Sequence, residues 1–316
     1  MSTTPPIPVG ATAQPPAAPS DAERIARLRQ PRMRPGRWIA EIGWRHVVGL
    51  AVVVFATFPL IYVLSASLNP GGTLTGSNAL FREISIANYV DLLSDPRRPY
   101  ARWFLNTMVV GVVTSVGTVF LGALAAYAFS RMRFTGRRIG LLSLLLVQMF
   151  PQLLAVVAIY LLMQGVGEVF PLLGLDSLAG LILVYLGGAL GVNTYLMYGF
   201  FNTVPASIDE AAKIDGAGHA RIFFTIILRL VAPILAVIGL LSFVGTTSEF
   251  VISSALLTSP ENLTLAIGLF RYVSEETSTN YPVFAAGAVL AAIPVVALFL
   301  YLQRYIVAGL TAGSVK

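Results

Sequence analysis

The feature that most constrains this chain is a set of long stretches without Asp, Glu, Lys or Arg. The stretches are 46–81, 103–130, 139–167, 177–208, 230–248 and 277–303. Each is near or above the ~20 residues that a helix needs to cross the hydrocarbon of a bilayer. Because lipid cannot solvate ions or unpaired peptide groups, these stretches predict membrane-spanning helices.

The composition excludes several other classes of protein. Only 11% of the 316 residues are charged and 56% are hydrophobic, whereas a soluble domain has about 25% charged residues. The chain has no cysteine and two histidines, which excludes a disulfide framework and a Cys/His zinc site. We therefore expect an all-α integral membrane protein that binds neither a metal nor, despite its net charge of +6, nucleic acid.

We predict six transmembrane helices, and an even number places both termini on one side. Of the 21 lysines and arginines, sixteen lie on the side of the termini and five on the other. By the positive-inside rule both termini are cytoplasmic, which makes the chain a multi-pass protein of the cytoplasmic membrane. The predicted helices lie near 46–67, 104–129, 139–163, 179–201, 230–257 and 283–306, within a transmembrane domain over 46–306.

The two ends of the chain are predicted to be cytoplasmic tails. Residues 1–45 are rich in proline at first and then in arginine, a composition typical of disorder. This tail could simply set the topology, or its arginines could bind anionic lipid. Residues 307–316 form the short tail at the other end.

A second informative segment lies between the fourth and fifth predicted spans. Ser207 and Glu210 have the spacing of a capping box, with serine at the N-cap and glutamate at N3. Gly216 suits the left-handed residue that follows a helix. The segment therefore predicts a cytoplasmic helix of about two turns, which rests on the membrane and its own bundle or docks on another protein.

The same segment resembles the EAA loop of bacterial ABC importer permeases, through Glu210-Ala211-Ala212 and Gly216 and then Ile226, Leu228 and Pro233. The resemblance implies a type I ABC importer permease bundle with a cytoplasmic coupling helix. It implies that the coupling residues are Ser207, Glu210, Ala211, Ala212, Asp215 and Gly216. Arg229 stands where the family usually has a proline, so we expect a straighter start of the fifth helix.

Other motifs extend the resemblance from about residue 46 to the end. Within the family, their order is most similar to the six-helix permease of maltose/maltodextrin importers, although the C-terminal pattern is common to other sugar permeases. The motifs are Phe58-Pro59, Ser65-Ala66-Ser67-Leu68, Asn88-Tyr89, Asn106-Thr107, the stretch 126–134, Met149-Phe150-Pro151 and the stretch 303–313.

The resemblance also implies partners. Neither Lys213 nor Lys316 lies in a G-x-x-x-x-G-K-[ST] loop, so ATP would be bound by a partner, and the chain is expected to be a transport subunit and not an enzyme. The implied partners are two ATPase subunits, a second homologous permease and an extracytoplasmic solute-binding protein. The C-terminal residues Gln303, Gly309 and Gly313 would contact the ATPases, or form a frayed end.

Glu249 is the only acidic residue inside a predicted span, which makes it a candidate functional group. With Ser248 it could line a sugar pathway, or it could have a structural role. Other polar residues in the spans are expected to form interhelical hydrogen bonds; they are Asn106, Gln148, Gln152, Asn193 and Tyr195. The alternative functions are transport of another solute, such as trehalose or glycerol phosphate, and ion-driven secondary transport, which would predict several intramembrane acids.

Overall fold

The computed structural model describes residues 36, 39–71, 79–274 and 281–312, and within these ranges all regular structure is helical. The helices are η1 (Ile39–Gly43), α3 (Trp44–Leu68), α4 (Ala87–Ser94), α5 (Tyr100–Arg131), α6 (Arg137–Gln148), α7 (Gln152–Val169), η2 (Pro171–Leu173), α8 (Leu178–Ala189), α9 (Val192–Phe201), α10 (Ala206–Ile214), α11 (His219–Arg221), η3 (Ile222–Ile227), α12 (Leu228–Leu230), α13 (Ala232–Ser248), α14 (Val251–Leu256), α15 (Leu265–Ser274) and α16 (Tyr281–Ala312).

Three continuous helical stretches are long and apolar enough to cross a membrane. They are Glu41–Leu68, Tyr100–Arg131 and Tyr281–Tyr305. Three further candidates are helix pairs with sharp bends: α6 with α7 (102°), α8 with α9 (52°), and His219–Leu230 with α13 (79°). The described residues are thus consistent with six spans, and the number six stays a prediction.

The breaks are the main difference from the predicted helices. The range 139–163 was expected to be one helix, but it is interrupted at Met149-Phe150-Pro151, where proline cannot donate a helical hydrogen bond. Gln148, just before that break, supports the break between α8 and α9. Its amide donates to the Gly188 carbonyl (2.7 Å) and accepts from the Val192 N–H (3.2 Å).

The expectation of a straighter fifth helix was wrong. The chain bends by 79° between Leu230 and Ala232 although Arg229 replaces the proline. Pro233 lies in the first turn of α13, where its missing N–H costs no helical hydrogen bond. The bend therefore occurs at a new helix start, directly before the proline that is kept.

Helical structure extends into both predicted tails. Residues 39–45 are helical, and α16 continues to Ala312. The remainder of the expected N-terminal tail lies, except for Gly36, outside the described residues. The last four residues of the expected C-terminal tail, 313–316, also lie outside them.

The described residues divide into two units, and the boundary between the units lies between Phe58 and Pro59. In the first unit, the described residues from Trp44 to Phe58 are all exposed, and most are large and apolar. An apolar surface of this kind is stable in lipid but not in water.

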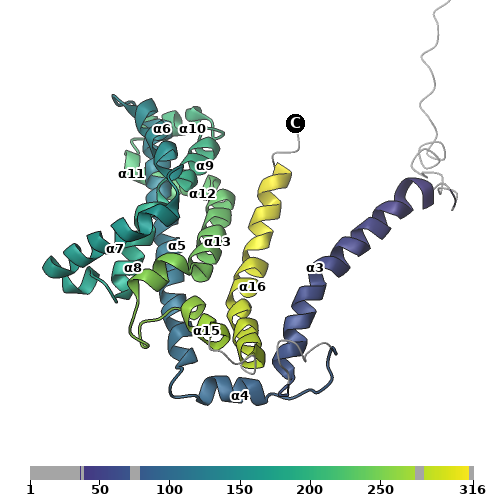
Figure 1. Ribbon diagram of the computed structural model, residues 1–316. Coiled ribbons are helices and arrows are strands. Elements are labelled where there is room, and N and C mark those ends of the chain that lie inside the picture. The colour runs from purple at the N-terminus through teal and green to yellow at the C-terminus, as the bar shows by residue number, and fades with distance from the viewer. Residues whose placement is uncertain (1–35, 37–38, 72–78, 275–280, 313–316) are drawn as a thin grey trace, which may run out of the picture. The chain divides into compact units, whose positions relative to one another are not determined.

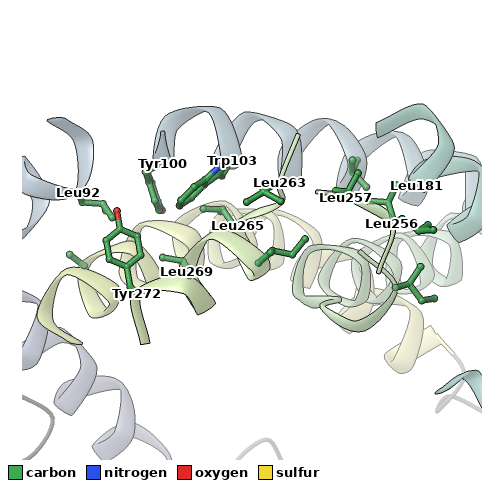
Figure 2. Close-up of a cluster of buried hydrophobic side chains, with 14 of the residues drawn as sticks. Leu92, Tyr100, Trp103, Leu181, Leu256, Leu257, Leu263, Leu265, Leu269 and Tyr272 are labelled. Carbon is green, nitrogen blue, oxygen red and sulfur yellow. The ribbon is translucent and has the colours of Figure 1, made fainter. Parts of the chain in front are cut away.

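In the second unit, α5 is the central helix and packs against α8, α9, α13 and α15. Figure 1 shows α10 near one end of α5, and α4 and α15 near the other. Each end has its own buried apolar cluster. The cluster at the α15 end includes Trp103, Leu263 and Leu265 (Figure 2), and the cluster at the α10 end includes Ala126, Phe201 and Ala212.

Candidate functional site

The predicted short helix exists as α10, but it begins differently from the prediction. Pro205 is its N-cap, no side chain caps its N-terminus, and Ser207 is already the second helical residue. The capping-box expectation was therefore wrong. The proline fixes an extended residue directly before the helix, and the helix can start there without a serine cap.

The other end of α10 has the predicted geometry. Gly216 has φ +79°, which a side chain would strain. The Gly216 N–H donates to the Lys213 carbonyl (3.0 Å), and the Ala217 N–H donates to the Ala212 carbonyl (2.9 Å). This pair of bonds is a Schellman motif, which ends the helix at a defined residue.

The two faces of α10 differ in character. Asp209 and Ala212 are buried, whereas the predicted coupling residues Ser207, Glu210, Ala211 and Asp215 are exposed. Ile214, one helical turn beyond Glu210 and Ala211, is 87% exposed. Because residues at i, i+3, i+4 and i+7 share one face, Ser207, Glu210, Ala211 and Ile214 form one exposed face, which we call the α10 outer face.

An ion pair fixes the buried face of α10. Arg131, the last residue of α5, places Nε 2.8 Å from Oδ2 of Asp209, and both side chains are largely buried. A second guanidinium nitrogen of Arg131 donates to the Val204 carbonyl (2.8 Å). Neither residue was predicted as a site residue. The available signals were that Arg131 lies in the family motif 126–134 and that Asp209 directly precedes Glu210.

Aromatic residues join the same end of α5 to the segment after α10. Tyr127 Oη lies 3.4 Å from Nδ1 of His219. The Tyr127 and Phe223 rings lie 5.1 Å apart between centroids. The segments before, within and after the predicted coupling loop thus all contact the last turns of α5.

Glu249 lies between α13 and α14, and its side chain caps the N-terminus of α14. Its carboxylate accepts hydrogen bonds from the Ile252 N–H (2.7 Å), the Ser253 N–H (3.0 Å) and the hydroxyl of Tyr185 (2.5 Å). Ser248 donates to the Val244 carbonyl of its own helix (2.8 Å). Through these contacts Glu249 holds α14 and Tyr185 in place, which is a structural role. A role of Glu249 and Ser248 in a sugar pathway stays a prediction.

At the α15 end, hydrogen bonds join α5 to the loop before α15. Trp103 Nε1 donates to the Pro260 carbonyl (2.8 Å). Asn106 donates to the carbonyls of Glu261 (2.8 Å) and Leu263 (3.0 Å), and Thr107 Oγ1 accepts from the Leu265 N–H (2.7 Å). Asn106 therefore bonds to a loop and does not form the interhelical hydrogen bond that was expected of it.

Asp176 fixes the other side of that loop. Its carboxylate accepts from the N–H groups of Thr258 and Ser259 (both 2.9 Å) and from the Ser259 hydroxyl. Burial alone would raise the pKa of Asp176, but these hydrogen bonds favour the carboxylate and hold the pKa below its usual 3.8.

The remaining predicted positions are separate from α10 in sequence. Gln303 and Gly309 lie in α16, and Gly313 lies outside the described residues. Two of the family motifs contact each other directly. Ser67 and Tyr89 hydroxyls lie 2.8 Å apart, and Asn88 donates to the Ser67 carbonyl (2.9 Å).

Comparison with known proteins decides the family. The model of a family described as "Binding-protein-dependent transport system inner membrane component" matches residues 118–311, more than half of the chain. The chain belongs to this family. Its identification as an ABC sugar-importer permease from the EAA loop and the other motifs is thereby confirmed.

Curated relatives of this family member cover nearly the whole chain. It is 40% identical over 266 residues to the galactooligosaccharides transport system permease protein GanQ of Bacillus subtilis, which covers 84% of this chain and 92% of GanQ. It is 38% identical over 299 residues to the maltose/maltodextrin transport system permease protein MalG of Photorhabdus laumondii, which covers 91% of this chain and 98% of MalG.

Solved structures show the same fold. A chain of a bacterial ABC transporter involved in the import of the acidic polysaccharide alginate matches with a TM-score of 0.73 at 25% identity, over 87% of this chain and 99% of that one. These matches confirm an all-α, multi-pass membrane permease that is not itself an enzyme. The orientation of its termini stays a prediction.

Proposed function

We propose that this permease carries maltodextrin-type oligosaccharides across the cytoplasmic membrane and is driven by two ATPase subunits, one of which docks on α10. It would pair with a second homologous permease and receive sugar from an extracytoplasmic solute-binding protein, with both of its termini in the cytoplasm. ATP would be bound by the ATPase subunits. The substrate class is supported by relatives named for maltose/maltodextrin and for galactooligosaccharide transport.

The α10 outer face is the observation that carries the docking proposal. It combines a carboxylate at Glu210, a small side chain at Ala211 and an apolar side chain at Ile214 that is 87% exposed. An exposed isoleucine of this kind is stabilised when a partner covers it. The small Ala211 allows a partner to approach the backbone closely, and Glu210 supplies a charge for a cationic group.

The docking proposal is tested by Glu210→Ala in the complete complex, reconstituted in proteoliposomes. We expect ATP hydrolysis to persist in part while sugar uptake per ATP falls by about tenfold, a typical size for coupling between two sites. Glu168→Ala, which removes an exposed acid distant in sequence from α10, is the control and should behave as wild type. Unchanged uptake per ATP in Glu210→Ala would contradict the proposal.

The substrate is tested by competition. Unlabelled maltotriose should reduce uptake of labelled maltotriose far more than galactooligosaccharide, trehalose or glycerol phosphate does. Stronger competition by one of the other three would reassign the substrate. Uptake by this chain alone, driven by an ion gradient without ATPase subunits, would instead show a secondary transporter.

A further inference from the structure

Few contacts hold α10 to the rest of the second unit. Only Asp209 and Ala212 of its nine residues are buried. Among the described residues Asp209 is the one buried charged residue of the second unit's interior, and α10 has few close backbone neighbours. Ala212 has a single methyl group to pack, so the ion pair of Asp209 is the principal specific contact of this helix.

The partner of Asp209 determines which span receives the motion of α10. Arg131 is the last residue of α5, a helix of 32 residues that packs against α8, α9, α13 and α15. Its guanidinium contacts both Asp209 in α10 and the Val204 carbonyl just before α10. Separation would leave a buried carboxylate and a largely buried guanidinium unpaired, which is strongly unfavourable, so the ends of α5 and α10 are held together.

We propose that Arg131 and Asp209 are positioning residues that make α10 and α5 move as one rigid body. A force applied at the α10 outer face then reaches the centre of the bundle through α5. This inference rests on the proposed function, because it needs a partner that moves α10. It adds that α5 is the span to which the motion of α10 is passed, and that Arg131 and Asp209 link the two helices.

The first test compares single variants with a charge exchange in the reconstituted complex. Arg131→Gln and Asp209→Asn should each lower sugar uptake per ATP by about tenfold. The double variant Arg131→Asp with Asp209→Arg should recover at least part of this loss, which a loss of packing alone does not explain. Arg133→Gln, which removes an exposed arginine two residues further on, is the matched control and should couple normally.

The second test does not require the ion pair to be mutated. The chain contains no cysteine, so spin labels can be placed at Arg133→Cys, just beyond α5, and at Lys213→Cys, an exposed residue near the end of α10 that is not part of the α10 outer face. We expect one narrow distance distribution that is the same without nucleotide and with ATP bound. A distance that changes between these states would overturn the proposal even if the ion-pair variants fail to assemble.

The two proposals fail in distinguishable ways. Normal coupling in Arg131→Gln and Asp209→Asn, together with uncoupling in Glu210→Ala, would overturn only the link between α5 and α10. Normal coupling in all three variants would overturn the docking of an ATPase on α10 as well. Uncoupling of the single variants, with recovery in the charge exchange, supports both.

Discussion

The two ends of α5 hold their neighbouring segments by different chemistry. At the α15 end, Trp103, Asn106 and Thr107 bind backbone groups of one loop through neutral hydrogen bonds and pack into a cluster of large side chains. At the α10 end, Arg131 binds Asp209 through charge, and the contribution of α10 to the buried apolar cluster is the single methyl group of Ala212.

This difference indicates that the contacts at the α15 end serve mainly stability and that those at the α10 end serve mainly coupling. Neutral hydrogen bonds to buried backbone groups are costly to break, because each leaves an unsatisfied peptide group. At the α10 end, α10 has little packing of its own, so the ion pair is what holds it to α5, and separating the two largely buried charges would be strongly unfavourable. Substitutions at the α15 end should therefore affect unfolding first, and those at the α10 end should affect coupling first.

The largest effect is expected for Trp103→Ala. Trp103 is 1% exposed, and its ring packs so closely on Gly268 that an added methyl group there would overlap it. Loss of the ring should lower the free energy of unfolding by about 3–5 kcal/mol, measured by thermal unfolding in detergent. Trp44→Ala, at a tryptophan 56% exposed, should change it by less than about 0.5 kcal/mol; equal losses would contradict the packing argument.

A smaller loss of stability is expected for Thr107→Val. The substitution keeps the shape of the side chain but removes the acceptor of the buried Leu265 N–H, which should cost about 2 kcal/mol. Thr114→Val is a matched control on the same helix, because the buried Oγ1 of Thr114 has no hydrogen-bond partner among the described residues. If the control loses as much stability as Thr107→Val, the hydrogen bond is not the cause.

A still smaller effect is expected at the α10 end for Gly216→Ala. Its φ of +79° is strained for alanine, so the end of α10 should be destabilised by about 1 kcal/mol. This local destabilisation would be seen as faster hydrogen exchange of the α10 amides, with unchanged exchange in α15. Gly218→Ala, at φ −73° with open space around it, should leave the exchange of both helices unchanged. Global unfolding at lower temperature in Gly216→Ala would contradict the separation of the two ends.

The smallest effect is expected for Asp176→Asn, because the carboxylate is partly exposed and solvent screens its charge. The folded protein holds the pKa of Asp176 below 3.8. Its contribution to stability is therefore complete above about pH 4 and is lost as the pH falls through the lowered pKa. The difference in melting temperature between wild type and Asp176→Asn should shrink on acidification below pH 4, and a difference independent of pH would exclude the charge as its source.

The family membership of the chain could be predicted from the sequence, and so could part of the candidate site. The charge-free stretches located the helices, and Gly216 marked the end of α10, because both signals are local properties of the chain. The breaks at residues 149–151 and 190–191 were not predicted. A polar side chain elsewhere in the sequence, Gln148, satisfies the backbone groups at the second break, and such support is invisible to hydropathy.

The sequence by itself determined that this chain belongs in lipid, that it carries a short helix before a left-handed glycine, and that it resembles sugar-importer permeases. These properties follow from composition and from residues close together in the chain. Only the tertiary structure decided which face of α10 is exposed and that Asp209 meets Arg131, 78 positions earlier in the chain. The physical reason is that burial and charge pairing depend on which distant segments pack together, and a local pattern does not specify this.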